Sequence, residues 1–149
     1  MAAWYECKVR YDKMHENGAV RKVSERFLVD ALSFTEAEAR IIEERTPYIS
    51  GDFAVKAIKS TNITEIFWDE KGDYWYLGKL LFTEIDEKGN EKKKNTLVLI
   101  QANDFKSALD NLLEGMKGTV IDYEISSINK TPILEVYKAN QGKRTGDNK

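Results

Sequence analysis

The sequence has few of the residues that carry most enzyme chemistry and covalent cross-links. Its 149 residues include one cysteine, Cys7, one histidine, His15, and two prolines. A single cysteine cannot form an internal disulfide, which agrees with a reducing compartment. A lone histidine has no second histidine beside which it could bind a metal ion or act as an oriented general base. These shortages argue against a zinc site, a disulfide scaffold and a histidine-based active site.

The chain also lacks a long apolar run and a strong net charge. No segment approaches the roughly 18 apolar residues that a membrane span requires, and the first residues lack the basic and apolar regions of a secretory signal. We therefore expect a cytoplasmic protein without a membrane role. Because the formal net charge is only −2, binding to nucleic acid would need a local basic patch.

An aromatic strand pattern opens the chain and recurs later. Residues 4–11 alternate between two faces, which predicts a half-buried strand. One face carries Tyr5, Cys7, Val9 and Tyr11, and the other carries Trp4, Glu6, Lys8 and Arg10. Residues 75–82 repeat this pattern in the same phase, beginning at Trp75. The recurrence indicates an internal duplication.

The first copy continues as a hairpin, a helix and further strands. Asn17-Gly18 favours a hairpin turn, and residues 20–31 form the returning strand, with Phe27 and Val29 among the residues on its core face. Ser33 has the spacing of a helix cap, so we expect a helix over residues 34–45 that ends at Thr46-Pro47. A third strand is expected at 53–59 and a short fourth strand near 64–68.

The second copy predicts the same elements. Strands are expected at 75–85 and 94–102, a helix at 104–114 capped by Asp104, and a last strand that begins at Pro132. The copies align at an offset of 71 positions through the helix and at an offset of 67 from Gly51 and Gly118 onward. Each half is therefore a β-β-α-β-(β) unit.

These patterns predict an α+β fold made by internal duplication. We expect antiparallel sheets, each with one helix on one face, related by a pseudo-twofold axis. The first repeat covers residues 1–68, residues 69–74 form a polar linker, and the second repeat covers residues 75–138. We expect both repeats to pack as one globular domain. Residues 139–149 contain no apolar anchor, so we expect a flexible tail.

No pattern in the chain specifies a reaction. His15 falls in the predicted hairpin tip, which favours an exposed turn residue, and Cys7 falls on an apolar strand face, which favours a small core residue. The segment 115–119 lacks the strand and the spacing of a phosphate-binding loop. We identify no catalytic, cofactor-binding or metal-binding residues and expect a protein that is not an enzyme.

Aromatic and basic residues on the strands are the strongest functional pattern. Aromatic stacking beside cations on an exposed sheet is a common way to hold single-stranded nucleic acid or nucleotides. The candidate residues are Trp4, Lys8, Arg10, Arg21, Lys22, Arg26, Trp75, Lys79, Lys92, Lys93 and Lys94. Our hypothesis is a non-enzymatic binding module for nucleic acid or a nucleotide-like ligand.

Two other interpretations of the tryptophans stay open. Trp4 and Trp75 would be hydrophobic anchors if the protein were a protein-interaction or assembly factor with no nucleic-acid role. They would be packing residues if they fill the core or the joint between the repeats, with the lysines merely solvating a strand edge. Exposure of the indole rings distinguishes these interpretations.

Three segments together resemble an uncharacterised protein family from Bacteroidetes and their mobile elements. They are Trp4–Tyr11, with the sequence WYECKVRY, Phe27–Arg40, with the sequence FLVDALSFTEAEAR, and Glu114–Thr119. The resemblance extends over nearly the whole chain. It implies a bacterial source and a cytoplasmic setting. Because the family is a domain of unknown function, it implies no catalytic residues.

Overall fold

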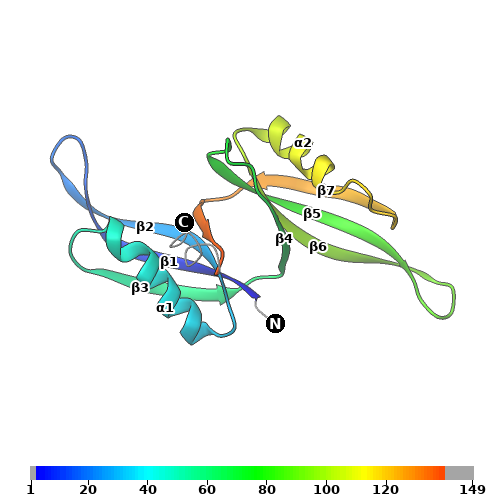
Figure 1. Ribbon diagram of the computed structural model, residues 1–149, viewed down its shortest axis with the longest axis horizontal. Helices are drawn as coiled ribbons and strands as arrows, with labels where there is room; N and C mark the ends of the chain where they lie inside the picture. Colours follow the sequence, from blue (N-terminus) through cyan, green and yellow to red (C-terminus); the bar gives the residue numbers. More distant parts are fainter. Residues whose placement is uncertain (1–2, 140–149) are drawn as a thin grey trace, which may run out of the picture. The chain divides into compact units, whose positions relative to one another are not determined.

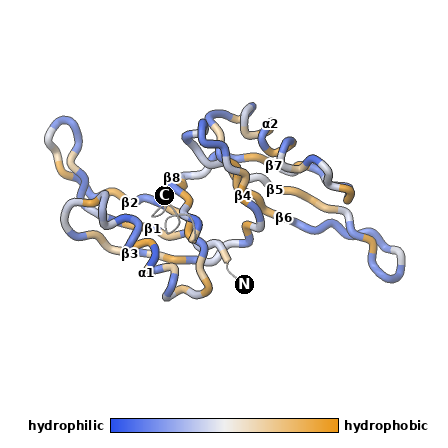
Figure 2. The backbone as a smooth tube through the Cα atoms, in the orientation of Figure 1, coloured by the Kyte–Doolittle hydropathy of each residue, from blue (hydrophilic) through white to orange (hydrophobic). Residues whose placement is uncertain are grey.

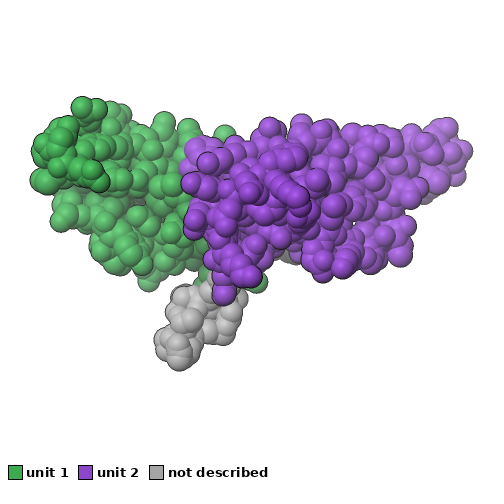
Figure 3. All heavy atoms as spheres, turned by 90° about the horizontal axis from the view of Figure 1, so that it is seen from above, with its two compact units in different colours: residues 1–61, 133–149 green, residues 62–132 purple. Residues whose placement is uncertain are grey.

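The computed structural model describes residues 3–139, and the predicted flexible tail lies outside them except for Ala139. Within this part the chain forms two compact units, which Figure 3 draws in different colours. Figure 1 labels helices and strands of both units. One unit combines Met1–Thr61 with Ile133–Lys149, and the other is Asn62–Pro132. Neither helix of the described residues has the length or the apolar run that a membrane crossing needs.

The first unit is a four-stranded sheet with one helix. Its strands stand in the order β3-β1-β2-β8. The elements are β1 (Ala3–Met14), β2 (Val20–Ala31), α1 (Phe34–Arg45), the short 3-10 helix η1 (Thr46–Tyr48), β3 (Phe53–Ser60) and β8 (Ile133–Tyr137). The helix predicted at 34–45 is confirmed, and its cap is Ser33, whose side chain accepts a hydrogen bond from Glu36 N.

The second unit repeats this arrangement. Its strands stand in the order β4-β6-β5-β7, again with one helix. The elements are β4 (Ile63–Phe67), β5 (Tyr74–Ile85), β6 (Glu91–Ala102), α2 (Phe105–Gly115) and β7 (Tyr123–Lys130). Asp104 caps α2 as predicted, because its side chain accepts from Ser107 N. The α+β class and the duplicated unit are thus confirmed.

The fourth strand of each repeat lies in the sheet of the other repeat. β4 follows β3 in the chain but pairs with β6, and β8 follows β7 but pairs with β2. Both of these pairings are parallel, so the prediction of purely antiparallel sheets is wrong for the fourth strands. The compact units consequently differ from a division of the chain at the linker 69–74.

The register of the sheets corrects the second offset between the repeats. Tyr5 pairs with Ser60, and its counterpart Tyr76, 71 positions later, pairs with Lys130. Lys130 follows Ser60 by 70 positions, so the third strands align at an offset of 70, and the predicted offset of 67 is wrong. The fourth strands share the offset of 70, because Ile63 pairs with Leu97 and Ile133 with Arg26. The two glycines that suggested 67 stand at different places in their loops, because Gly51 lies two residues before β3 and Gly118 lies five residues before β7.

Each unit buries its core between the helix and one face of the sheet. In the first unit Cys7, Val9, Phe27, Val29 and Ile41 are fully buried together. The predicted core face of residues 20–31 is confirmed by Phe27 and Val29. The corresponding core of the second unit contains Leu80, Val98, Ile100, Ala108 and Leu112. Figure 2 shows hydrophobic strand centres and hydrophilic hairpin ends in both units.

The predicted linker 69–74 is an ordered turn over residues 69–73, bound to the end of β6 and to α2, and Tyr74 already belongs to β5. Asn111 Nδ2 donates to Asp69 Oδ2 at 2.9 Å, and Asp69 N donates to Gln101 Oε1 at 2.9 Å. Gly72 lies so close to β6 that a Cβ atom there would stand 2.5 Å from Ala102 N, which only glycine avoids. The hydrogen bond from Asn111, and then that from Lys71 N, lower the pKa of the Asp69 carboxyl.

We expect the Asp69 carboxylate in this turn to stabilise the folded protein, and we expect this stabilisation to be lost at acid pH. A carboxyl whose pKa is lowered by folding stabilises the folded state above its unfolded pKa, near about 4, and this contribution is lost as the pH falls. Asp69→Asn should therefore flatten the fall of unfolding free energy between about pH 5 and pH 2, as measured by urea titration. Asp52→Asn, at an exposed carboxylate of the first unit, is the control. Equal flattening by both variants would contradict the expectation.

The shared register of the exchanged strands predicts that a single repeat pairs with its own copy. Residues 1–68 expressed alone should form a dimer in which Ile63–Phe67 of each copy fills the place of β8 beside β2, because both strands occupy the same register. Light scattering after size-exclusion chromatography measures the mass. Residues 1–61, which lack the exchanged strand, should not form this dimer. A folded monomer of residues 1–68 would contradict the prediction.

Candidate functional site

The outer face of the first sheet, opposite α1, collects basic side chains from three strands. The register places Lys8 opposite Arg26, Arg10 opposite Ser24, and Asp12 opposite Lys22, while Lys59 on β3 pairs with Glu6. Trp4 lies on the same face at one end of β1. We call the residues Lys8, Arg10, Lys22, Arg26 and Lys59 the basic face.

Acidic residues neutralise only part of the basic face. Arg26 Nη1 contacts Glu6 Oε2 at 3.0 Å, and Lys22 Nζ contacts Asp12 Oδ1 at 3.1 Å. Within residues 3–139, Lys8 and Arg10 form no ion pair. Lys8 and Arg26 stand directly opposite each other on antiparallel strands, and like charges in this position destabilise a sheet.

The second unit carries only part of this charge at the matching positions. Leu77, Leu81 and Leu97 stand where the first unit has Glu6, Arg10 and Arg26, and Asn129 stands where it has Lys59, whereas Lys79 and Lys93 retain the charges of Lys8 and Lys22. Lys79 is exposed and pairs with Leu97 on β6. The same fold therefore forms without the counterparts of Arg10, Arg26 and Lys59, so these three charges are not a requirement of the architecture.

The two tryptophans have different environments. Trp4 is half-buried, and its carbonyl oxygen accepts hydrogen bonds from the backbone N and the hydroxyl of Thr61, each at 2.9 Å. Trp75 is only 4% exposed and contacts the ring of Trp68 edge-on, with a centroid distance of 5.4 Å. Trp75 consequently offers no free ring face to a base in this structure.

The remaining candidate residues lie on the hairpins, away from the centre of the basic face. Arg21 pairs with Lys13 and lies on the opposite face of the first sheet. Lys92, Lys93 and Lys94 are exposed near the tip of the second hairpin. Lys93 Nζ donates to Thr83 Oγ1 at 3.0 Å, and Lys92 stands opposite Glu84. The charge of this second hairpin is mixed, since Glu84, Glu87 and Glu91 lie on it.

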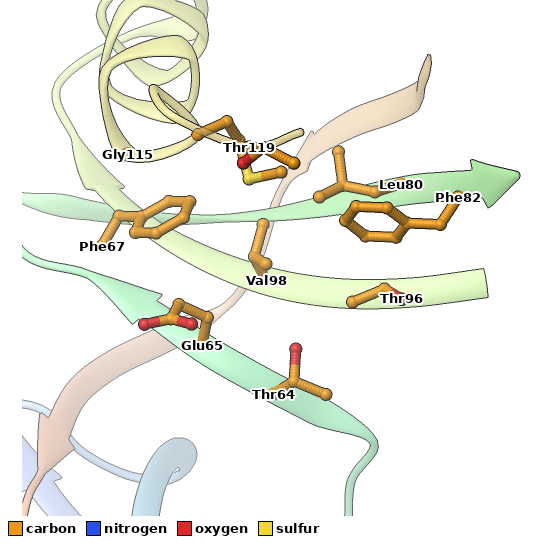
Figure 4. A pocket seen from close by; sticks show the side chains of 10 residues that line it. Thr64, Glu65, Phe67, Leu80, Phe82, Thr96, Val98, Gly115 and Thr119 are labelled. Atoms are coloured by element: carbon orange, nitrogen blue, oxygen red, sulfur yellow. The ribbon is translucent and has the colours of Figure 1, made fainter. Parts of the chain in front are cut away.

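A cavity of about 280 Å³ in the second unit was not anticipated from the sequence. It opens between β4, the centre of the sheet and the end of α2. Figure 4 shows the rings of Phe67 and Phe82 on either side of Val98. The full lining is Thr64, Glu65, Phe67, Leu80, Phe82, Thr96, Val98, Gly115, Met116 and Thr119.

Side chains of the first unit fill the equivalent position. Arg45, the counterpart of Met116, places its guanidinium 4.4 Å from the ring centroid of Phe27 and 4.9 Å from that of Tyr48. Its Nη1 donates to the hydroxyl of Tyr137 at 2.8 Å. Burial raises the pKa of the Tyr137 hydroxyl. Phe27 corresponds to Val98, so the second unit has a smaller residue on the floor and no cation.

Sequence patterns could have revealed this cavity only by comparison of the two repeats. The substitutions of Phe27 by Val98 and of Arg45 by Met116 both remove volume or charge at matched positions. The cavity also needs the exchanged strand β4, which supplies Phe67 from the other repeat. Among the described residues, no group of three histidine, cysteine, aspartate or glutamate side chains is placed to hold a metal ion. His15 is exposed in the first hairpin, as expected.

A comparison with protein-family models matches residues 3–139 to DUF4494, described as a domain of unknown function. The chain belongs to the DUF4494 family. Since the match covers all residues that the structure describes, the duplicated unit with exchanged strands lies wholly inside the family domain. Comparisons with curated proteins and with solved structures give no match. The function must therefore be argued from the basic face of the first unit and the cavity of the second unit.

Cys7 is a core residue, and we expect its thiol to be unreactive in the folded protein. The side chain is fully buried, and burial, with Glu6 nearby, raises the pKa of the thiol to about 12. The thiolate is the reactive species, so a raised pKa and lack of access both slow modification. Ellman's reagent at pH 8 should react with native protein at least about 100-fold more slowly than with protein in urea. Equal rates would contradict this assignment.

Proposed function

We propose that the protein is a non-enzymatic binding module that holds single-stranded nucleic acid on the basic face of its first unit. The observation that carries the proposal is the direct opposition of Lys8 and Arg26, beside Arg10, with Glu6 as the nearest paired acid. A phosphate backbone provides repeated negative charge at a spacing that several such cations can follow. A mononucleotide-like ligand would use the same cations with fewer contacts.

The unfavourable charge arrangement supports a ligand role. Opposed like charges on neighbouring strands destabilise a sheet, and the second unit avoids the opposition, because Leu97 stands in place of Arg26 opposite Lys79. A polyanion bound across Lys8, Arg10 and Arg26 would remove this repulsion. In the free protein the ion pair of Arg26 with Glu6 offsets part of this cost, and the bound polyanion would offset the remainder.

The proposal includes only one of the two tryptophans that the sequence suggested as binding residues. Trp4 lies on the same sheet face as Lys8 and is half-buried, so part of its side chain is available for contact with a base. Because Trp75 is only 4% exposed, the proposal assigns it no stacking role. The proposal therefore rests on the first unit, with Trp4, Lys8, Arg10, Lys22 and Arg26 as its binding residues.

The assembly-factor alternative loses most of its support from the same observation. It required Trp4 and Trp75 as exposed anchors, and an indole that is 4% exposed cannot insert into a partner without a rearrangement. A cytoplasmic location and an origin in Bacteroidetes are part of this proposal as well, and both stay predictions.

Binding to labelled single-stranded DNA and RNA, followed by fluorescence anisotropy across a salt series, tests the proposal. Affinity should fall as salt rises, because each neutralised phosphate releases counterions. The double variant Lys8→Gln/Arg10→Gln removes two cations that have no acidic partner in the described structure. It should reduce the magnitude of the salt slope by about 1.4, since each phosphate contact to a single strand contributes about 0.7.

A matched control changes the net charge by the same amount as the test variant. Lys92→Gln/Lys93→Gln removes two exposed cations from the hairpin of the second unit and should leave the salt slope within error of the unaltered protein. Equal losses in the two variants would show that binding follows net charge rather than the basic face. Absence of binding to any single strand at low salt would overturn the proposal.

A further inference from the structure

The cavity of the second unit is separate from the basic face and has its own chemistry. Its walls are mainly apolar, formed by Leu80, Val98 and Met116 together with the rings of Phe67 and Phe82. Glu65 is the one charged residue in its lining, and the structure shows no ion pair to this carboxylate within residues 3–139. The hydroxyls of Thr64, Thr96 and Thr119 complete the lining.

The shape of one wall is fixed by close packing. Gly115, at the end of α2, lies against the ring of Phe67, and a Cβ atom there would stand 2.7 Å from Phe67 Cε1. Glutamate occupies the matching position 44 in the first unit. The glycine thus allows the ring of Phe67 to lie under the helix end, where it forms one side of the cavity (Figure 4).

The first unit shows which chemical group this position of the fold accommodates. There the guanidinium of Arg45 lies against the ring of Phe27 and donates to Tyr137. An aromatic ring attracts a cation through the negative charge of its face. In the second unit Met116 replaces Arg45 and Val98 replaces Phe27, whereas aromatic rings are retained at the positions of Tyr11 and Tyr137 as Phe82 and Phe67. Two aromatic rings have been kept, and the internal cation and the ring beneath it have been lost.

We propose that this cavity binds a small organic cation with an apolar body, such as a primary ammonium or guanidinium that carries an aryl or alkyl group. The apolar body would lie between Phe67, Phe82 and Val98, and the cationic head would approach the carboxylate of Glu65. The threonine hydroxyls would accept its remaining hydrogens. A carboxylate or phosphate ligand is disfavoured, because the lining supplies one negative charge and no cation.

The volume limits the ligand to a small molecule. Pockets for drug-sized ligands typically range from about 300 to 1,000 Å³, and this cavity lies just below that range. One aromatic ring with a short charged side chain is of suitable size, so phenethylammonium is the probe that we choose. Phenethyl alcohol has the same body and a neutral head, and hydrocinnamate has a negative head.

Methyl resonances of methionine provide a local readout. The sequence contains three methionines, Met1, Met14 and Met116, and only Met116 lines the cavity. In protein labelled with ¹³C at the methionine methyl groups, phenethylammonium should shift the Met116 resonance in a saturable manner. We expect phenethyl alcohol to bind about five- to tenfold more weakly, because a hydrogen bond to a charged group is stronger than one between neutral groups.

Variants of the cavity separate its charge from its volume. Glu65→Gln should weaken phenethylammonium about five- to tenfold and leave phenethyl alcohol unchanged, whereas Glu87→Gln on the hairpin should change neither. Val98→Phe restores the large residue of the first unit and should abolish binding of both compounds. Thr119→Tyr, at an exposed wall residue, fills the cavity without altering the core and should act in the same way.

Two outcomes would overturn the proposal. The first is absence of any saturable shift of Met116 in protein whose folding is confirmed by circular dichroism. The second is binding of phenethyl alcohol or hydrocinnamate as tight as that of phenethylammonium, with no effect of Glu65→Gln. Neither result bears on the basic face, because that surface lies in the other unit and is measured by a separate assay.

Discussion

The parallel pairing of β4 with β6 and of β8 with β2 is the constraint on which the structure depends. Without the exchanged strand, the backbone groups of one edge of β6 and of β2 would have no strand partner. The exchanged strands also bring Phe67 and Tyr137 against the two cores. The cavity of the second unit follows from this pairing, since Phe67 forms one of its walls, and so does the filled position of the first unit, where Tyr137 accepts the hydrogen bond from Arg45.

The duplication has allowed the two units to diverge while the backbone stayed the same. The first unit has charges on its outer sheet face and a cation, Arg45, packed among aromatic rings. The second has leucines on the matching outer face and an open cavity at the matching inner position. Each unit therefore serves as the reference for the other. A feature present in only one of them cannot be attributed to the demands of the fold.

Local patterns predicted most of the fold, and long-range pairing accounts for the remainder. The alternation around Trp4 and the cap at Ser33 depend on neighbouring residues, and both were predicted correctly. The exchange of β4 was not, because a five-residue strand has the same local pattern in either sheet. The same limit applied to the sites: alternation placed Lys8 and Arg10 on one face, but the burial of Trp75 and the cavity depend on contacts between distant segments.

The exchange of strands also constrains when the protein can fold during synthesis. The first unit includes Ile133–Tyr137, so its sheet stays incomplete until β8 has left the ribosome. The second unit, Asn62–Pro132, is continuous in sequence and has all of its strands earlier. The order of completion is thus reversed relative to the order of the repeats. Until β8 arrives, the edge of β2 is open to strands of other chains, and a slow ribosome prolongs that exposure.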